Sequence, residues 1–231
     1  MDLEGKLEAE AEDRISELPD AILCHILSFL PTTLYAVRTT ILSTRWKNVW
    51  TSVPNLVFED REFPGRFEAF MMFVDCVFSL RNNSSNILKF RFLGGSNVEK
   101  EDISRIDRWI CTAVRGNVVE LDLQFYSGTF EFKMPQSVFI CKTLVTLRVE
   151  SDCISYAPPS TSGPFPSLKL LDFTAFNDYT TSLVKLCPFC PVLEDLVIGI
   201  NGYDKNVRIS APELKTLRIH SPWDEVIEFF Y

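Results

Sequence analysis

An apolar frame that recurs six times is the feature that most constrains the fold of this chain. The frame consists of an apolar residue, two variable residues, an apolar residue, one variable residue and a final apolar residue. It fits ILKFRF (87–92), VVELDL (118–123), LVTLRV (144–149), LKLLDF (168–173), LEDLVI (193–198) and LKTLRI (214–219). The middle apolar residues lie at positions 90, 121, 147, 171, 196 and 217, so the last four intervals are 26, 24, 25 and 21 residues. Intervals of this length are typical of leucine-rich repeats.

The spacing inside the frame predicts strands that share one core. The last two apolar positions are two residues apart, so on a strand their side chains point to the same face. One strand cannot bury such side chains alone, whereas stacked strands bury them in one continuous core. We therefore predict a short leucine-rich-repeat solenoid. A run of ordinary buried strands in another α/β fold would also fit this loose frame.

The residue between the last two apolar positions points to the opposite, open face of each strand. Repeat proteins use such a face for binding, so its charged residues are candidate substrate-binding residues: Arg91, Asp122, Arg148, Asp172 and Arg218. The first four alternate in sign. Because neighbouring strands lie about 4.8 Å apart, these four residues could equally form a ladder of ion pairs.

Four helices are predicted outside the frames. Apolar residues recur at helical spacing in 66–80 and in 101–115, and each of these segments needs a surface to lie on. Towards the N-terminus, we expect one helix to begin at Pro19 and to stop at Pro31. The apolar spacing in AVRTTILSTRWKNVW predicts a further helix over 36–50.

The helix after Pro19 is apolar almost all round. Between Asp20 and Leu30 only His25 and Ser28 are polar. Such a helix must be covered on two sides, and a module of about 45 residues buries too little surface to cover both. The remaining apolar face indicates a protein partner. Alternatively, all of these side chains pack against the repeats within one domain.

Composition excludes several classes of protein. The net charge of −8 and the pI near 4.9 argue against a nucleic-acid-binding protein, which needs basic surface. No apolar run approaches the ~20 residues of a membrane helix, and the acidic N-terminus is not a signal peptide. Seven cysteines, an odd number, indicate a reducing compartment. We therefore expect an intracellular protein, in the cytoplasm or the nucleus.

Two segments near the N-terminus resemble a known family. DRISELPDAILCHILSFLP and AVRTTILSTRWKNVWTSVPNLVFED resemble the F-box of plant F-box/leucine-rich-repeat proteins, and FPSLKLLDF and CPVLEDLVI resemble the repeats of its FBD-type members. The resemblance covers residues 14 to about 220. It implies an α+β or α/β fold, with a three-helix F-box followed by a short, horseshoe-like solenoid. The expected domains are a disordered acidic tail (1–13), an F-box (14–60) and a leucine-rich-repeat domain (61–231), which is either short or truncated.

The resemblance also implies a function and partners. It implies a non-catalytic, substrate-recognition subunit of an SCF-type E3 ubiquitin ligase, which binds a Skp-type adaptor and, through it, cullin and RING subunits. The repeats would hold an unknown protein target for ubiquitination and proteasomal degradation. The implied adaptor-binding residues are Leu18, Pro19, Ile22, Leu23, Ile26, Leu27, Leu30, Leu42 and Trp46.

One departure from the family pattern leaves a second function open. The segment LPTTLYAVRTT is one residue longer than usual and lacks a Lys-Asp pair. We expect the loop after Pro31 to absorb the extra residue. A repeat scaffold or inhibitor that no longer engages a ligase remains the alternative function.

The sequence contains few candidate metal ligands or catalytic residues. Cys187 and Cys190 have the spacing of a redox pair or of half a zinc site. No second such pair exists, and His25 and His220 are the only histidines. A complete tetrahedral site is poorly supplied, and a nucleophile activated by histidine has little support. We expect no metal, no cofactor and no enzymatic activity.

Overall fold

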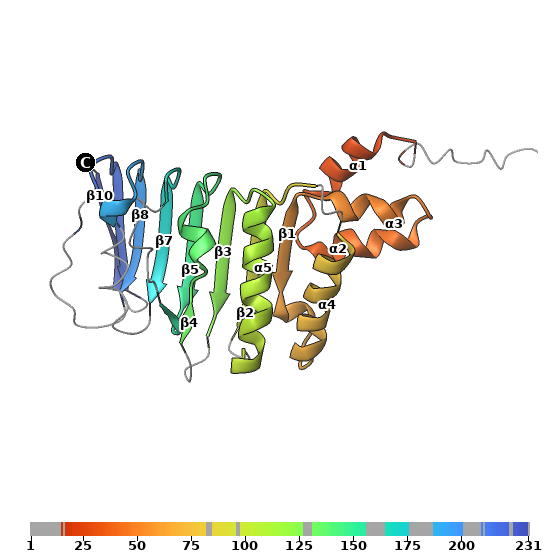
Figure 1. The fold of residues 1–231 in the computed structure, drawn as a ribbon, viewed down its shortest axis with the longest axis horizontal. Coiled ribbons are helices and arrows are strands. Elements are labelled where there is room, and N and C mark those ends of the chain that lie inside the picture. Colours follow the sequence, from red (N-terminus) through yellow and green to blue (C-terminus); the bar gives the residue numbers. More distant parts are fainter. Residues whose placement is uncertain are drawn as a thin grey trace, which may run out of the picture.

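The structure is a computed structural model that describes residues 15, 17–81, 85–95, 98–126, 131–155, 165–175, 187–200, 209, 211–221 and 224–230. The predicted tail, 1–13, lies outside these residues. The described part combines helices with one long, mostly parallel sheet, and Figure 1 shows the N-terminal helices grouped beyond one end of that sheet. None of the described helices has both the length and the apolar character that crossing a membrane requires.

Eight strands form the sheet in the order β1-β2-β3-β5-β7-β8-β9-β10. They are β1 (Asn55–Glu59), β2 (Lys89–Gly95), β3 (Glu120–Phe125), β5 (Thr146–Ser151), β7 (Leu170–Ala175), β8 (Asp195–Ile200), β9 (Thr216–Ser221) and β10 (Asp224–Phe230). All neighbours are parallel except β9 and β10. The six predicted strands are confirmed as β2, β3, β5, β7, β8 and β9. Two short strands, β4 (Phe132–Lys133) and β6 (Ile154–Ser155), pair separately.

The middle apolar residues of the six frames stack in register across the sheet. Each is the Cα partner of the next, in the order Phe90, Leu121, Leu147, Leu171, Leu196 and Leu217. None of these side chains is more than 5% exposed. The repeats therefore share one continuous core, as the frame predicted.

Helices cover the apolar face of the first strands. The predicted helices 66–80 and 101–115 are confirmed as α4 (Phe67–Leu80) and α5 (Ile103–Arg115), and a short α6 (Gln136–Phe139) follows. The Phe70 ring of α4 stacks on Phe92 of β2, with centroids 5.5 Å apart. Trp109 of α5 contacts the same Phe92 ring at 5.6 Å. The charged residues of β2 and β3 alternate with the buried side chains of these strands and therefore point to the opposite face.

The single helix predicted over 36–50 is wrong. The segment instead forms the end of α2 (Thr33–Arg38), η1 (Thr39–Ile41), α3 (Trp46–Val49) and the first residue of η2 (Trp50–Ser52). The Thr39 hydroxyl donates to the carbonyl oxygen of Ala36 at 2.7 Å, at the point where α2 ends. Hydroxyl side chains compete in this way with helical hydrogen bonds, and the segment carries five of them, Thr39, Thr40, Ser43, Thr44 and Thr51, within or beside it.

The first helix, α1 (Asp20–Leu27), begins directly after Pro19 as predicted but ends before Pro31. The Ser28 hydroxyl donates to the carbonyl oxygen of His25 at 2.6 Å. The amides of Phe29 and Leu30 bond three residues back, to Ile26 and Leu27. This tightened turn ends α1, and Pro31 only follows it.

Strand β1, which was not predicted, joins the N-terminal helices to the sheet. Its segment VPNLVF (53–58) fits the apolar frame but lies inside the segment that resembles an F-box. The Val57 amide donates to Thr33 Oγ1 at 2.8 Å, and Asn55 Nδ2 donates to the Ser28 carbonyl oxygen at 3.1 Å. The Thr32 hydroxyl donates to Glu62 at 2.6 Å, in η3 (Asp60–Glu62) just after β1. The N-terminal helices therefore pack directly on the first strand.

Candidate functional site

Helix α1 attaches to the protein through one face. Leu23 and Leu27, one turn apart, are 0% and 4% exposed. They belong to a core that also contains Trp46, the first residue of α3, and Trp50, the residue after α3. The structure thus places Leu23, Leu27 and Trp46, three of the nine predicted adaptor-binding residues, inside the chain's own core. Their burial leaves the other face of α1 to be explained.

The other face of α1 exposes apolar side chains. Ile22 and Ile26, also one turn apart, are 46% and 43% exposed, and Phe29 just beyond the helix is 74% exposed. We group these three side chains with Tyr35, Ile41 and Leu42, which are exposed on α2, on η1 and just after it, and call the six residues the N-terminal apolar surface. Of the remaining predicted residues, Pro19 is exposed, whereas Leu18 and Leu30 are half-buried against the core.

Exposed apolar side chains are concentrated in this part of the chain. Among the described residues, eleven large hydrophobic side chains are exposed, and seven of them lie between residues 15 and 42. Apolar surface gathered in this way is typical of a binding site for another protein. The sequence reasoning missed Phe29, Tyr35 and Ile41. The helical spacing of Phe29, seven residues after Ile22, was a signal that could have identified it.

Two contacts of Arg45 join the start of α1 to the residue before α3. The Asp20 carboxylate, in the first turn of α1, lies 2.7 Å from the guanidinium of Arg45, the residue before α3. The same guanidinium donates to the carbonyl oxygen of Leu18. The burial of Leu23 and Leu27 sets the direction in which Ile22 and Ile26 point, and the two contacts of Arg45 reinforce it.

The second candidate site is the charged row on the open face of the sheet. Arg91, Asp122, Arg148 and Asp172 are consecutive partners across β2, β3, β5 and β7. Arg91 Nε lies 3.1 Å from Asp122 Oδ2, and Arg148 Nε lies 3.9 Å from Asp172 Oδ2. Two ion pairs of the predicted ladder are therefore present, whereas Asp122 and Arg148, its middle neighbours, form none with each other among the described residues. Arg218 lies in the same row on β9, two strands away from Asp172.

Partial burial raises the pKa values of the two aspartates in this row. Burial raises the pKa of Asp122, while the guanidinium groups of Arg91 and Arg148 counteract the rise. Burial likewise raises the pKa of Asp172, opposed by Arg148 and His220. The arginines thus offset the cost of placing two carboxylates on a half-buried face.

The next row along the strands was missed. It contains Gln124, Glu150, Thr174, Gly199 and His220, in register across β3, β5, β7, β8 and β9. The hydroxyl group of Tyr126, just after β3, donates to the Glu150 carboxylate and accepts from Gln124 Nε2 at 3.2 Å. Extending the alternation of the frame by two residues would have identified this row.

The cysteine pair lies in the core rather than at a surface. Cys187 and Cys190 are each 1% exposed. Burial raises the pKa of Cys187 to about 11 and that of Cys190 to about 12, so both thiols stay neutral near pH 7. Within the described ranges, no three His, Cys, Asp or Glu residues come together as metal ligands could.

Two models of known protein families match parts of this chain. Residues 15–58 match the F-box domain, and residues 106–229 match the leucine-rich repeats of FBD-associated F-box protein At5g56370. The second match alone covers more than half of the 231 residues. The chain belongs to the plant F-box/leucine-rich-repeat family. The F-box match ends in β1, and the repeat match covers the strands of the sheet from β3 into β10.

Relatives in Arabidopsis thaliana match nearly the whole F-box/leucine-rich-repeat chain. F-box/LRR-repeat protein At4g14103 is 36% identical over 99% of this chain and 59% of its own length. F-box/LRR-repeat protein At4g14096 is 39% identical over 86% of this chain and 41% of its own length. F-box protein At3g03040 is 35% identical over 90% of this chain and 45% of its own length. The chain therefore spans about half the length of the relatives that it matches. No solved structure matches it.

Proposed function

We propose that this chain is a substrate-recognition subunit of an SCF-type E3 ubiquitin ligase. The F-box binds a Skp-type adaptor, which connects it to cullin and RING subunits, and the repeats bind a protein target. The chain supplies no catalytic group. It holds the target at high local concentration beside a ubiquitin-charged partner, which leads to ubiquitination and proteasomal degradation. This role places the chain in the cytoplasm or the nucleus.

The observation that supports this proposal most is the division of α1 into two apolar faces. Leu23 and Leu27 are buried in the chain, whereas Ile22 and Ile26 are exposed. Covering one such side chain fully is worth roughly 1.5–3 kcal/mol, so a few of them can dominate an interface. We assign the adaptor contact to the N-terminal apolar surface and Pro19, with Leu18 and Leu30 at its margin. In this assignment, Leu23, Leu27 and Trp46 position α1.

The proposal includes an architecture. We assign the three-helix F-box to residues 14–60 with α1, α2 and α3, and a horseshoe-like repeat domain to residues 61–231.

The target is proposed to bind the open face of the sheet at the charged row. Arg91, Asp122, Arg148 and Asp172 already pair with each other, but partly exposed ion pairs are worth only ~0–1 kcal/mol each. A charged target can therefore displace these pairs at little cost. Arg218 extends the row towards β10.

Co-purification with a Skp-type adaptor tests the function. The whole chain is expected to retain the adaptor, and Ile26→Asp is expected to lose it while keeping the wild-type unfolding transition. Leu80→Asp is the matched control, because Leu80 is 65% exposed but lies at the end of α4, outside the F-box. This control should retain the adaptor.

Undiminished adaptor binding by a folded Ile26→Asp variant would refute the assignment of the surface. A wild-type chain that is folded but binds no adaptor would favour the alternative, a repeat scaffold or inhibitor that does not engage a ligase.

A further inference from the structure

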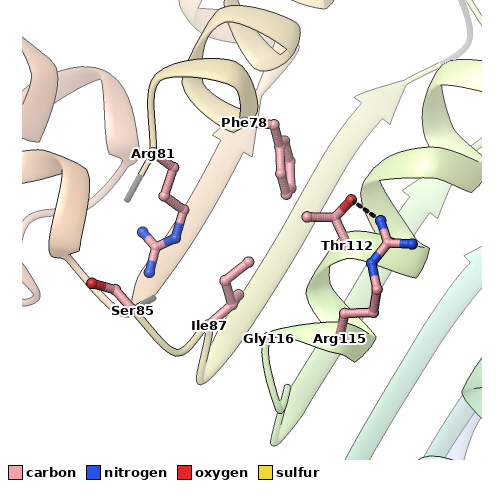
Figure 2. Close-up of a pocket in the computed structure, with 7 residues that line it drawn as sticks. All are labelled: Phe78, Arg81, Ser85, Ile87, Thr112, Arg115 and Gly116. Atoms are coloured by element: carbon pink, nitrogen blue, oxygen red, sulfur yellow. Dashed lines mark hydrogen bonds between the residues drawn. The ribbon is translucent and has the colours of Figure 1, made fainter. Parts of the chain in front are cut away.

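A pocket of about 330 Å³ lies between the ends of α4 and α5 and the start of β2. Figure 2 shows Arg81, which follows α4, on one side and Arg115, the last residue of α5, on the other. Phe78 and Ile87 form an apolar wall between these two arginines. Pockets of about 300–1,000 Å³ are typical of small-molecule sites. Its lining differs from that of a mostly apolar site, because two arginine residues, Arg81 and Arg115, contribute to it.

Arg81 is buried with part of its hydrogen-bonding capacity unused. The residue is only 7% exposed. One terminal nitrogen donates to the carbonyl oxygen of Val53, and the other donates to that of Asn86 at 2.6 Å. The Nε–H group is also buried, but it has no hydrogen-bond partner in the described part of the chain. A buried donor without a partner costs free energy, which a ligand that accepts this hydrogen bond would recover.

The charge of Arg81 is also uncompensated. Its contacts are backbone carbonyl groups, and no carboxylate within the described ranges forms an ion pair with it. Burial, only partly counteracted by the Cys24 thiol, lowers the pKa of Arg81 to about 10. Arg81 is still a cation near pH 7. A buried cation without an anionic partner is costly, so the pocket beside it favours negative charge.

Arg115 adds a second cation to the same pocket. Its side chain is exposed, and its guanidinium donates to the Thr112 hydroxyl at 3.0 Å. A cation at the C-terminal end of α5 also interacts favourably with the helix dipole. That explains the location of Arg115 but not the unused Nε–H of Arg81. Ser85 and Thr112 also line the pocket.

We propose that this pocket binds a small oxyanion, a phosphate or carboxylate group, between Arg81 and Arg115. The anion accepts the hydrogen bond of Arg81 Nε–H and is held on its other side by the Arg115 guanidinium. Hydrogen bonds between a guanidinium and an oxyanion are charge-assisted and strong. The Thr112 hydroxyl already donates to the carbonyl oxygen of Arg108 at 2.8 Å, so the two guanidinium groups are the donors of the site. The site is separate from the N-terminal apolar surface, so it does not depend on the proposed ligase function.

The test uses the full chain with inorganic phosphate and with acetate as probes, against sodium chloride at equal ionic strength. Phosphate or acetate is expected to raise the unfolding temperature in a saturable way and to shift the NMR signal of Arg81 Nε–H. The probe that acts at the lower concentration distinguishes a phosphate site from a carboxylate site. Arg115→Gln should weaken binding of that probe about tenfold.

The matched control is Lys100→Gln, which removes the same charge from an exposed residue in η4 (Lys100–Asp102), before α5. It should bind the anion as the wild type does. Equal losses in Arg115→Gln and Lys100→Gln would show general charge screening and overturn the proposal. An Arg81 Nε–H signal that neither probe shifts would also overturn it, because Arg81 would then serve only to tie Val53 to Asn86.

Discussion

Asp75 on α4 accepts a hydrogen bond from the indole Nε1 of Trp109 on α5, at 2.8 Å. The same carboxylate accepts from Arg105 Nε and from Arg108, each at 2.9 Å. Trp109 itself is 1% exposed and contacts Phe92 of the sheet. Asp75 therefore connects the two covering helices and satisfies a buried donor of the core.

Replacing Asp75 by alanine is expected to lower the free energy of unfolding by about 1–3 kcal/mol, because it leaves the Trp109 donor unsatisfied. Urea unfolding followed by tryptophan fluorescence measures this loss. Glu101→Ala, at an exposed acid in η4, is the control and should change stability little. Equal stability of Asp75→Ala and the wild type would show that the contact is not formed in solution.

Gly199 provides the space in which Thr174 and His220 meet across β8. Their Oγ1 and Nε2 atoms are 3.3 Å apart, and a Cβ atom at Gly199 would lie 2.5 Å from Thr174 Oγ1. Gly199→Ala should therefore destabilise the chain by about 1–3 kcal/mol through overpacking. Adding Thr174→Ala should recover part of the loss, since that change removes the two clashing Thr174 atoms and leaves only His220 Nε2, 2.8 Å from the added Cβ.

A double-mutant cycle in chemical denaturant measures this coupling between Gly199 and Thr174. If the two losses simply added, the close approach over Gly199 would not exist.

The buried thiols of Cys187 and Cys190 should be unreactive in the folded chain. Reaction requires the thiolate, and burial raises both pKa values well above 9. Iodoacetamide at pH 8 should therefore modify exposed Cys76 first and should reach Cys187 and Cys190 only after unfolding. Peptide mass spectrometry after timed quenching gives the order. Rapid modification of Cys190 in the native chain would contradict this prediction and would favour a redox role for the pair.

Tyr126 should link stability to alkaline pH. Burial and the Glu150 carboxylate raise its pKa from 10 to about 12, so the folded chain keeps a proton that the unfolded chain releases. This contribution is complete below pH 10 and is lost as the pH rises from 10 to 12. Glu150→Gln should lower the pKa of Tyr126, whereas Glu131→Gln, at an exposed acid, should leave it unchanged. Ultraviolet absorbance of the phenolate follows the titration, and identical curves for both variants would contradict the assignment.

The repeats were predictable because their pattern is local. Each frame alternates on a strand, and the equal spacing implies that equivalent residues meet, as Phe90 and Leu121 do. The same reasoning located Arg91 beside Asp122. Strand β1 was missed because its frame lies inside the F-box segment. Antiparallel β10 was missed because its segment does not follow the frame.

The division of α1 into two faces could not be predicted from its sequence. Almost every residue from Ile22 to Leu27 is apolar, so no local pattern tells Ile26 from Leu27. Packing with Trp46 and Trp50 determines which side chains of α1 are buried, and those residues lie about 20 positions further along the chain. For the same reason, an acidic residue at Leu27 would disrupt the core, whereas one at Ile26 tests the surface.

The most direct test of the account is the dissociation constant of the complex between the chain and a Skp-type adaptor, measured by calorimetry for single alanine variants. Ile22→Ala, Ile26→Ala and Leu42→Ala should each raise the constant about tenfold or more, as residues central to an interface do. Met72→Ala is the control, because Met72 is 57% exposed on α4. It should bind as the wild type does. Wild-type affinity in all three F-box variants would contradict the claim that this exposed face binds the adaptor.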